Sequence, residues 1–173
     1  MPRYIGLLRG VNVGGHAKLP MTKLRELIES LGHTEVQTLI QSGNVVFSSP
    51  RKVTSGSIES ALERELGLTV PVVLRTPAEL QRILAENPFP GADPASLHVG
   101  FMSRKPPAAA IRELDTARFA PEEVAVRGLE LYFHLPNGMG HAKLPPYIDR
   151  RLGMPTTVRN WRTVTKLLEI ARH

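Results

Sequence analysis

The order of strand-like and helix-like patterns in residues 4–74 limits the possible folds of this chain more than any other feature. Two amphipathic helices are expected because apolar residues recur at helical spacing, one capped by Thr22 and ended by Gly32, the other over about Ser57–Leu66. The expected strands are Tyr4–Leu8, Val36–Gln41, Asn44–Phe47 and Val70–Leu74. Their order, strand-helix-strand-strand-helix-strand, is that of a ferredoxin-like α+β unit.

The rest of the chain predicts a second unit of the same kind. Thr76–Glu79 has the form of a capping box that begins a helix, and the break at Asn87–Gly91 is the expected seam between halves. Further strand and helix patterns lie at 97–102, 108–114, 124–126, 129–135 and 146–152, and a last helix follows Asn160. We therefore expect two pseudo-duplicated ferredoxin-like halves with antiparallel or mixed sheets, at residues 1–86 and 91–173, either separate or packed as one compact unit.

A six-residue segment occurs twice in the chain. Gly15–Pro20 and Gly140–Pro145 both read GHAKLP, and each copy lies between an apolar strand pattern and an amphipathic stretch. Such a repeat suggests an internal duplication with two related loops. The offset of the two copies is not half the chain length, so either the second half is permuted or part of the identity is coincidence.

Composition excludes several classes of site. The 173 residues include no cysteine, which rules out disulfides, a thiol nucleophile and cysteine-ligated zinc. The histidines are not spaced as metal ligands, so we expect no metal, and we expect no cofactor. No apolar run has the form of a signal peptide or a membrane span, so we expect a cytoplasmic protein that does not enter a membrane.

Positive charge is concentrated at the two ends of the sequence. The net charge is +6, with +5 in residues 1–25, +5 in residues 141–173 and −4 between them. The basic ends also carry the repeated loops. A positive field of this kind attracts nucleic acid or other phosphate-bearing partners, and the alternative is a soluble basic surface without a partner.

The glycine-rich loop from Arg9 to Lys18 is the first candidate for an anion-binding site. Its glycines allow a ligand to approach the backbone closely, and the helix that follows presents its N-terminus. The loop lacks the Gly-Lys-Ser/Thr ending of a P-loop, and the alternative is that Asn12 and the glycines only shape a tight turn. The expected ligand-binding residues are Arg9, Asn12, Gly14, Gly15, His16, Lys18, Ser42, Asn44, His141, Lys143, Arg159, Asn160 and Arg162.

The later members of this set also have structural interpretations. Ser42 and Asn44 are typical of a hairpin turn, and Asn160 is typical of a helix N-cap. Arg159 and Arg162 flank a helix start and could hold a phosphate there. His16 and His141 could transfer protons, although no catalytic partner is evident beside either.

Four motifs resemble the bacterial family called domain of unknown function 1697. They are residues 9–15 with Lys18, residues 41–47, residues 135–140 with Lys143-Leu144, and residues 159–161 with Thr163 and Lys166-Leu167. The resemblance covers nearly the whole chain and implies an α+β fold of two ferredoxin-like halves. It implies no activity. One departure is Ala142, where relatives usually have Ser, which argues against hydroxyl-dependent chemistry at that loop.

These observations favour a non-catalytic protein that binds nucleic acid or a phosphorylated small molecule through its basic loops. One alternative is an enzyme acting on a small phosphorylated metabolite, with Lys18 and Lys143 holding the phosphate and His16 or His141 as proton carrier. Another is a scaffold protein that self-associates through edge strands. The sequence does not distinguish an enzyme from a binding protein, and it does not give the oligomeric state.

Overall fold

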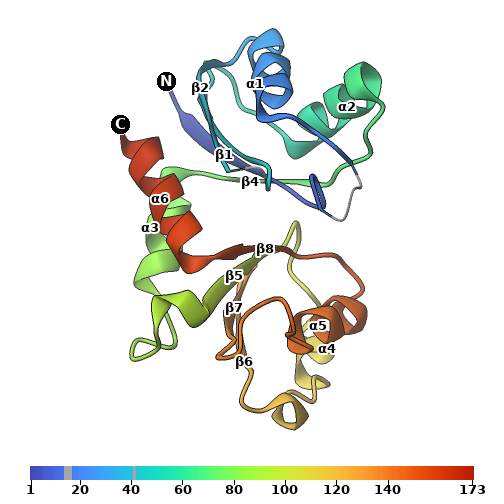
Figure 1. The fold of residues 1–173 in the computed structure, drawn as a ribbon, viewed down its shortest axis with the longest axis vertical. Helices are drawn as coiled ribbons and strands as arrows, with labels where there is room; N and C mark the ends of the chain where they lie inside the picture. Colours follow the sequence, from blue (N-terminus) through green and yellow to red (C-terminus); the bar gives the residue numbers. More distant parts are fainter. Residues whose placement is uncertain (14–16, 41) are drawn as a thin grey trace. The chain divides into compact units, whose positions relative to one another are not determined.

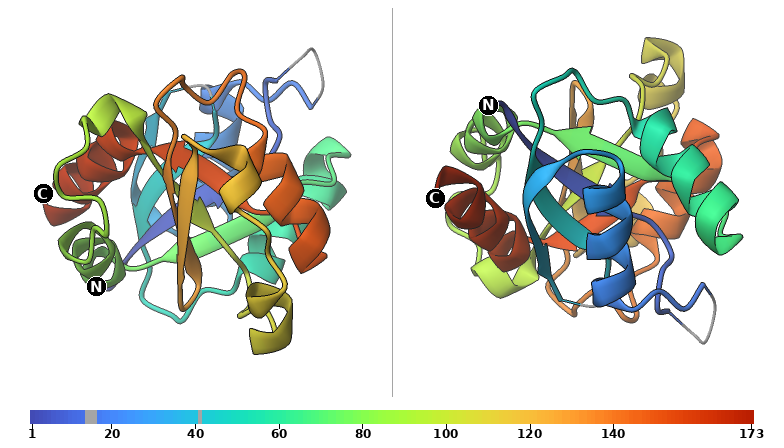
Figure 2. Two further views of the ribbon diagram at one scale, coloured as in Figure 1. Left: turned by 90° about the horizontal axis from the view of Figure 1, so that it is seen from below. Right: turned by 90° about the horizontal axis from the view of Figure 1, so that it is seen from above.

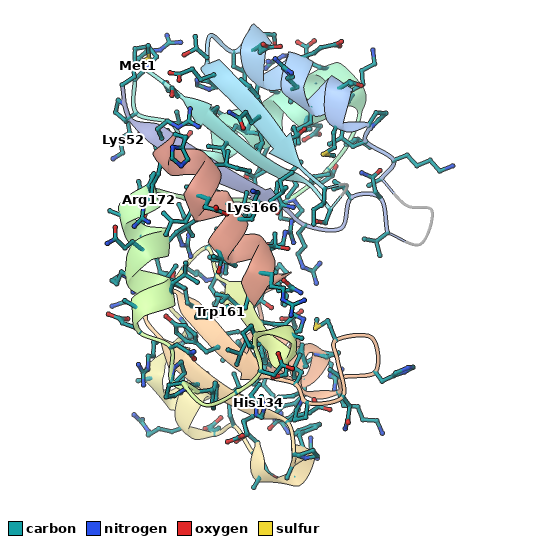
Figure 3. The ribbon with its side chains drawn as sticks, turned by 60° about the vertical axis from the view of Figure 1, so that its left-hand side comes forward. Met1, Lys52, His134, Trp161, Lys166 and Arg172 are labelled. Atoms are coloured by element: carbon teal, nitrogen blue, oxygen red, sulfur yellow. The ribbon has the colours of Figure 1, made fainter. Side chains whose placement is uncertain are left out.

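The computed structural model describes residues 1–13, 17–40 and 42–173, which form two compact units. Unit 1 consists of Met1–Arg82 and Lys166–His173, and unit 2 consists of Ile83–Thr165. Each boundary falls inside a helix, α3 (Pro77–Ala85) or α6 (Trp161–Arg172). Trp161 and Arg172 mark the two ends of α6 in Figure 3. The division differs from the expected ranges 1–86 and 91–173 because the C-terminal part of α6 packs in unit 1.

Unit 1 is a four-stranded antiparallel sheet with two helices on one face (Figures 1 and 2). Its elements are β1 (Arg3–Leu8), α1 (Met21–Ser30), β2 (Thr34–Leu39), β3 (Asn44–Ser48), α2 (Ser55–Leu66) and β4 (Val72–Arg75). The strand order is β2-β3-β1-β4. Leu24 and Ile28 of α1 and Ile58 and Leu62 of α2 are fully buried against the sheet, so the helical apolar spacing in the sequence directs these helices onto one core.

The helix starts of unit 1 confirm one expected cap and correct another. In the α3 capping box, the Thr76 N–H donates to Glu79 Oε1 at 3.0 Å, and the Glu79 N–H donates to Thr76 Oγ1 at 3.2 Å. The expectation that Thr22 caps α1 is wrong. The helix already begins at Met21, and its cap position is Pro20, which has no side-chain group to accept a hydrogen bond. Thr22 therefore lies inside the first turn.

Unit 2 contains a second four-stranded antiparallel sheet. Its elements are β5 (Leu97–Phe101), α4 (Ala108–Arg112), β6 (Glu123–Arg127), β7 (Glu130–His134), α5 (Leu144–Leu152) and β8 (Thr157–Asn160), with short 3₁₀ turns η1 (Pro94–Ser96) and η2 (Ala117–Phe119). The strand order is β6-β7-β5-β8. Strand β8 is absent from the sequence-based expectation. Its four residues are too few to show alternation, and it is formed by pairing with β5.

The two units have the same order of helices and strands and the same order of strands in the sheet. A glycine lies on the central strand of each, facing the helices. A Cβ atom on Gly6 would lie 3.0 Å from Val45 Cγ1, and one on Gly100 would lie 3.1 Å from the Phe133 ring. In both sheets glycine leaves room for a large side chain of the neighbouring strand. The chain is thus an α+β protein with two four-stranded antiparallel sheets.

The two GHAKLP copies lead into helices that have different places in the order of elements of their units. The first copy lies between β1 and α1, and the second follows β7 and ends inside α5, whose first two residues are Leu144 and Pro145. Because both sheets have the same unpermuted strand order, a head-to-tail duplication would not place the copies in these connections. The repeat is therefore no evidence for duplication of the units. Residues 15 and 16 of the first copy lie outside the described residues.

In the described part of the chain, none of the helices is both long and apolar enough to cross a membrane.

Candidate functional site

The first candidate loop is closed by the side chain of Asn12. Its Nδ2 donates to the Leu19 carbonyl and its Oδ1 accepts from the Leu19 N–H, both at 2.8 Å. Asn12 has a left-handed backbone with φ of 57°, a conformation that Asn tolerates better than most residues. Arg9 and Lys18 are exposed at the two ends of the loop. Gly14, Gly15 and His16 lie outside the described residues.

The β2–β3 turn lies against the start of this loop. The Leu8 N–H donates to the Gly43 carbonyl at 2.9 Å. Asn44 is fully buried, and its Nδ2 donates to the Leu39 carbonyl at 2.8 Å and to Ser42 Oγ at 3.0 Å. Unit 1 thus brings two predicted site segments together, with the Asn44 amide holding the turn.

The third candidate segment lies at the start of α6. Asn160 Oδ1 accepts from the Thr163 N–H at 3.0 Å, which confirms Asn160 as the N-cap. Arg162 is exposed, whereas Arg159 is buried. Burial lowers the pKa of the Arg159 guanidinium to about 10. Val158 packs in the core below α5, so Arg159 faces the opposite side of the sheet.

The N-terminus of α5, which lies within the second GHAKLP copy, binds a carboxylate of the protein itself. Glu122 Oε1 accepts from the Lys143 N–H at 3.1 Å and from the Leu144 N–H at 2.9 Å. Glu122 therefore binds the backbone donors of this helix start. A ligand at this loop would have to be bound by side chains. His141 and Lys143 are both exposed.

A hollow of about 510 Å³ lies beside this helix start. We call it the basic hollow. Three of its six lining side chains are cationic and exposed, and the other three are apolar. The lining residues are Arg118, Phe119, Ala142, Lys143, Pro146 and Arg150. Its volume is within the range of small-ligand pockets in proteins.

An aromatic pair supports the Arg118 side of the basic hollow. The rings of Phe119 and Tyr147 are 4.7 Å apart, and Arg118 Cζ lies 4.8 Å from the centroid of each. Tyr147 is buried, and its hydroxyl accepts from the Asp115 N–H at 2.9 Å. Arg151 Cζ lies 5.5 Å from the Tyr147 ring. Cation–π contacts hold the Arg118 guanidinium without neutralising its charge.

The three cations of the basic hollow have no acidic partners in the described ranges 1–13, 17–40 and 42–173. Exposed lysines and arginines elsewhere do pair, for example Lys23 with Glu26 and Arg25 with Glu29. Unpaired cations around one concave surface attract an anion more strongly than single surface charges do.

Two other hollows have different chemistry. One, of about 430 Å³, is lined by His134, Asp93 and six uncharged residues, and His134 Nδ1 lies 3.1 Å from Glu123 Oε1. The other, of about 380 Å³, contains Glu59 and Glu63. Neither offers the positive field that the sequence predicts for a phosphate site. Over the same described ranges, no group of three or more His, Asp or Glu side chains is placed to hold a metal ion.

The predicted site residues fall in both units. Arg9, Asn12, Lys18, Ser42 and Asn44 belong to unit 1. His141, Lys143, Arg159, Asn160 and Arg162 belong to unit 2. A single binding surface formed by both groups stays a prediction.

Sequence analysis missed most of the basic hollow. Lys143 is the one predicted residue that lines it. Arg150 could have been found from the sequence, because it lies seven residues after Lys143 and this spacing places both residues on the same face of a helix. The sequence gives no such indication for Arg118 and Phe119, because their place beside Tyr147 depends on tertiary packing.

Comparison with known proteins gives a matching family and a solved structure with a similar fold. A family model described as "Protein of unknown function (DUF1697)" matches residues 1–132, in agreement with the resemblance seen in the sequence motifs. The fold is similar to that of the conserved bacterial protein SP0830 from Streptococcus pneumoniae, with a TM-score of 0.70, 23% identity and 98% of each chain covered. No curated protein matches the chain.

Proposed function

Because the chain belongs to the DUF1697 family of proteins of unknown function, we propose a function from the chemistry of its site, namely that the basic hollow of unit 2 binds a phosphate-bearing ligand. The ligand is either a phosphorylated small molecule or a nucleic acid. The observation that carries this proposal is the grouping of Arg118, Lys143 and Arg150 around one hollow without acidic partners in the described residues.

The lining of the hollow favours binding over catalysis. Its six residues include no histidine and no carboxylate, the groups that most often transfer protons in active sites. Glu122 lies nearby, but its carboxylate accepts hydrogen bonds from the start of α5. In this proposal Glu122 positions Lys143, and the three cations bind the ligand.

We further propose that the two units are ferredoxin-like halves that arose by duplication. The shared order of elements, the shared strand order and the paired glycines Gly6 and Gly100 support this relation. A cytoplasmic location is also part of the proposal, supported by the absence of cysteine from the sequence.

Binding of phosphate compounds at low ionic strength tests the proposed function. The probes are inorganic tripolyphosphate, ATP, single-stranded RNA and duplex DNA, measured by calorimetry or anisotropy. We expect Lys143→Ala and Arg150→Ala each to weaken binding about tenfold, because each removes one charge-assisted contact. Affinity should also fall steeply as salt is raised.

The matched control is Lys52→Ala. Lys52, which is labelled in Figure 3, is exposed in unit 1 and does not line the hollow, yet its loss changes the net charge by the same amount. It should leave the affinity within about twofold. An equal loss in Lys52→Ala and Lys143→Ala would show nonspecific attraction, and failure of all four probes to bind would contradict the proposal.

A further inference from the structure

Building on the proposed function, we infer that the ligand of the basic hollow is a nucleotide whose base stacks on the guanidinium of Arg118 while its phosphates bind Lys143 and Arg150. The inference concerns the chemical class of the ligand. A free nucleotide and a nucleotide within a single strand share this chemistry.

The placement of Arg118 is the first argument. Its Cζ lies 4.8 Å from the centroids of both the Phe119 and the Tyr147 ring. Arg118 is also exposed and lines the hollow, so its guanidinium is accessible to a ligand there. A planar guanidinium stacks on flat rings, and arginine planes are a common platform for unpaired bases.

The rigidity of the platform is the second argument. Tyr147 is 2% exposed, and its hydroxyl accepts a hydrogen bond from the Asp115 N–H. Its ring is in contact with Phe119 and lies 5.5 Å from Arg151 Cζ. These contacts fix the rings beneath Arg118. A preorganised platform loses little side-chain entropy when a base stacks on it.

The mixed lining of the hollow is the third argument. Phe119, Ala142 and Pro146 give it an apolar part beside the cations. A bare phosphate or a sugar phosphate would leave this apolar surface in water, whereas a base would cover it. Lys143 and Arg150 are seven residues apart, which is about 10 Å along a helix. This separation lets the two cations bind different phosphate groups of one ligand.

The test compares ATP with inorganic tripolyphosphate on the full chain. The two probes carry similar chains of phosphates, but only ATP has a base. We expect ATP to bind about tenfold more tightly, because stacking of one base contributes a free energy of that order. Arg118→Lys keeps the charge and removes the planar face. It should abolish the preference for ATP, so that the ratio of the ATP and tripolyphosphate affinities falls to about one.

The outcomes separate this inference from the proposed function. Equal affinity of wild-type protein for ATP and tripolyphosphate would overturn the base-stacking inference and leave phosphate binding intact. Absence of binding by both would overturn the proposed function itself. A persisting ATP preference in Arg118→Lys would also contradict the role of Arg118. Circular dichroism of the variant checks that it is folded.

Two further probes identify the source of the nucleotide. Single-stranded RNA that competes with ATP in wild-type protein, and loses affinity in Arg118→Lys, assigns the site to single strands. ATP binding that RNA does not displace assigns it to free nucleotides. Duplex DNA has its bases stacked internally, so we expect Arg118→Lys and wild-type protein to bind it equally. A selective loss for duplex DNA would contradict stacking.

Discussion

Gly43 is the residue through which the two predicted site segments of unit 1 meet. Its φ is 89°, and a Cβ atom there would lie 2.7 Å from Val11 Cγ2 and 2.9 Å from Leu8 Cβ. Both the backbone conformation and the space therefore require glycine. We expect Gly43→Ala to lower the free energy of unfolding by about 2 kcal/mol or more, measured by urea denaturation.

Gly56 provides the matched control for this substitution. It lies in the first turn of α2 and has no left-handed φ, and outside the adjacent backbone of its own helix no atom of the described residues lies within 4 Å of a built Cβ. Gly56→Ala should be neutral or stabilising by up to about 1 kcal/mol, because alanine favours the helix. Equal destabilisation by the two variants would refute the packing argument.

At the scale of elements, Thr76 and Thr22 test how helix caps contribute to stability. Thr76 exchanges hydrogen bonds with Glu79 at the start of α3, whereas Thr22 lies exposed inside the first turn of α1. We expect Thr76→Ala to cost about 1 kcal/mol of unfolding free energy and Thr22→Ala to cost almost nothing. Thermal or urea denaturation measures both, and a larger loss in Thr22→Ala would contradict the observed caps.

Local patterns predicted most elements, and tertiary contacts explain the failures. The helix with Leu24 and Ile28 and the capping box at Thr76 follow from residues close in the sequence. Strand β8 does not, since pairing with β5 creates it. The same limit applies to the candidate site. Lys143 was found from its own loop, but Arg118 reaches the hollow through packing on Tyr147.

At the scale of the whole molecule, both units contain a buried histidine that resists protonation, His33 in unit 1 and His98 in unit 2. Burial lowers the pKa of His33 in unit 1, and the positive charge of Arg51 lowers it further. Burial also lowers the pKa of His98 in unit 2, partly opposed by a hydrogen bond with the backbone of Ser96. Within the described residues, neither Nδ1 has a hydrogen-bond partner. Burial thus favours the neutral form of both imidazoles.

This burial makes the stability of the protein dependent on pH. As pH falls below about 6.5, the two histidines bind more protons in the unfolded state than in the folded state, so the free energy of unfolding decreases. We expect the urea midpoint to fall between pH 7.5 and pH 5.5, and His33→Leu and His98→Leu each to reduce that fall. A double variant with the wild-type pH dependence would contradict this account.

The division of α6 between the units has a consequence for biosynthesis. Arg3 of β1 donates to the carbonyls of Ile170 and Ala171, so the sheet of unit 1 keeps contacts with a segment made long after it. Lys166 is translated 84 residues after Arg82. At about 5 to 20 residues per second, the nascent N-terminal sheet waits roughly 4 to 17 s for this partner. During that interval it emerges from the ribosome incomplete, and chaperones can bind it.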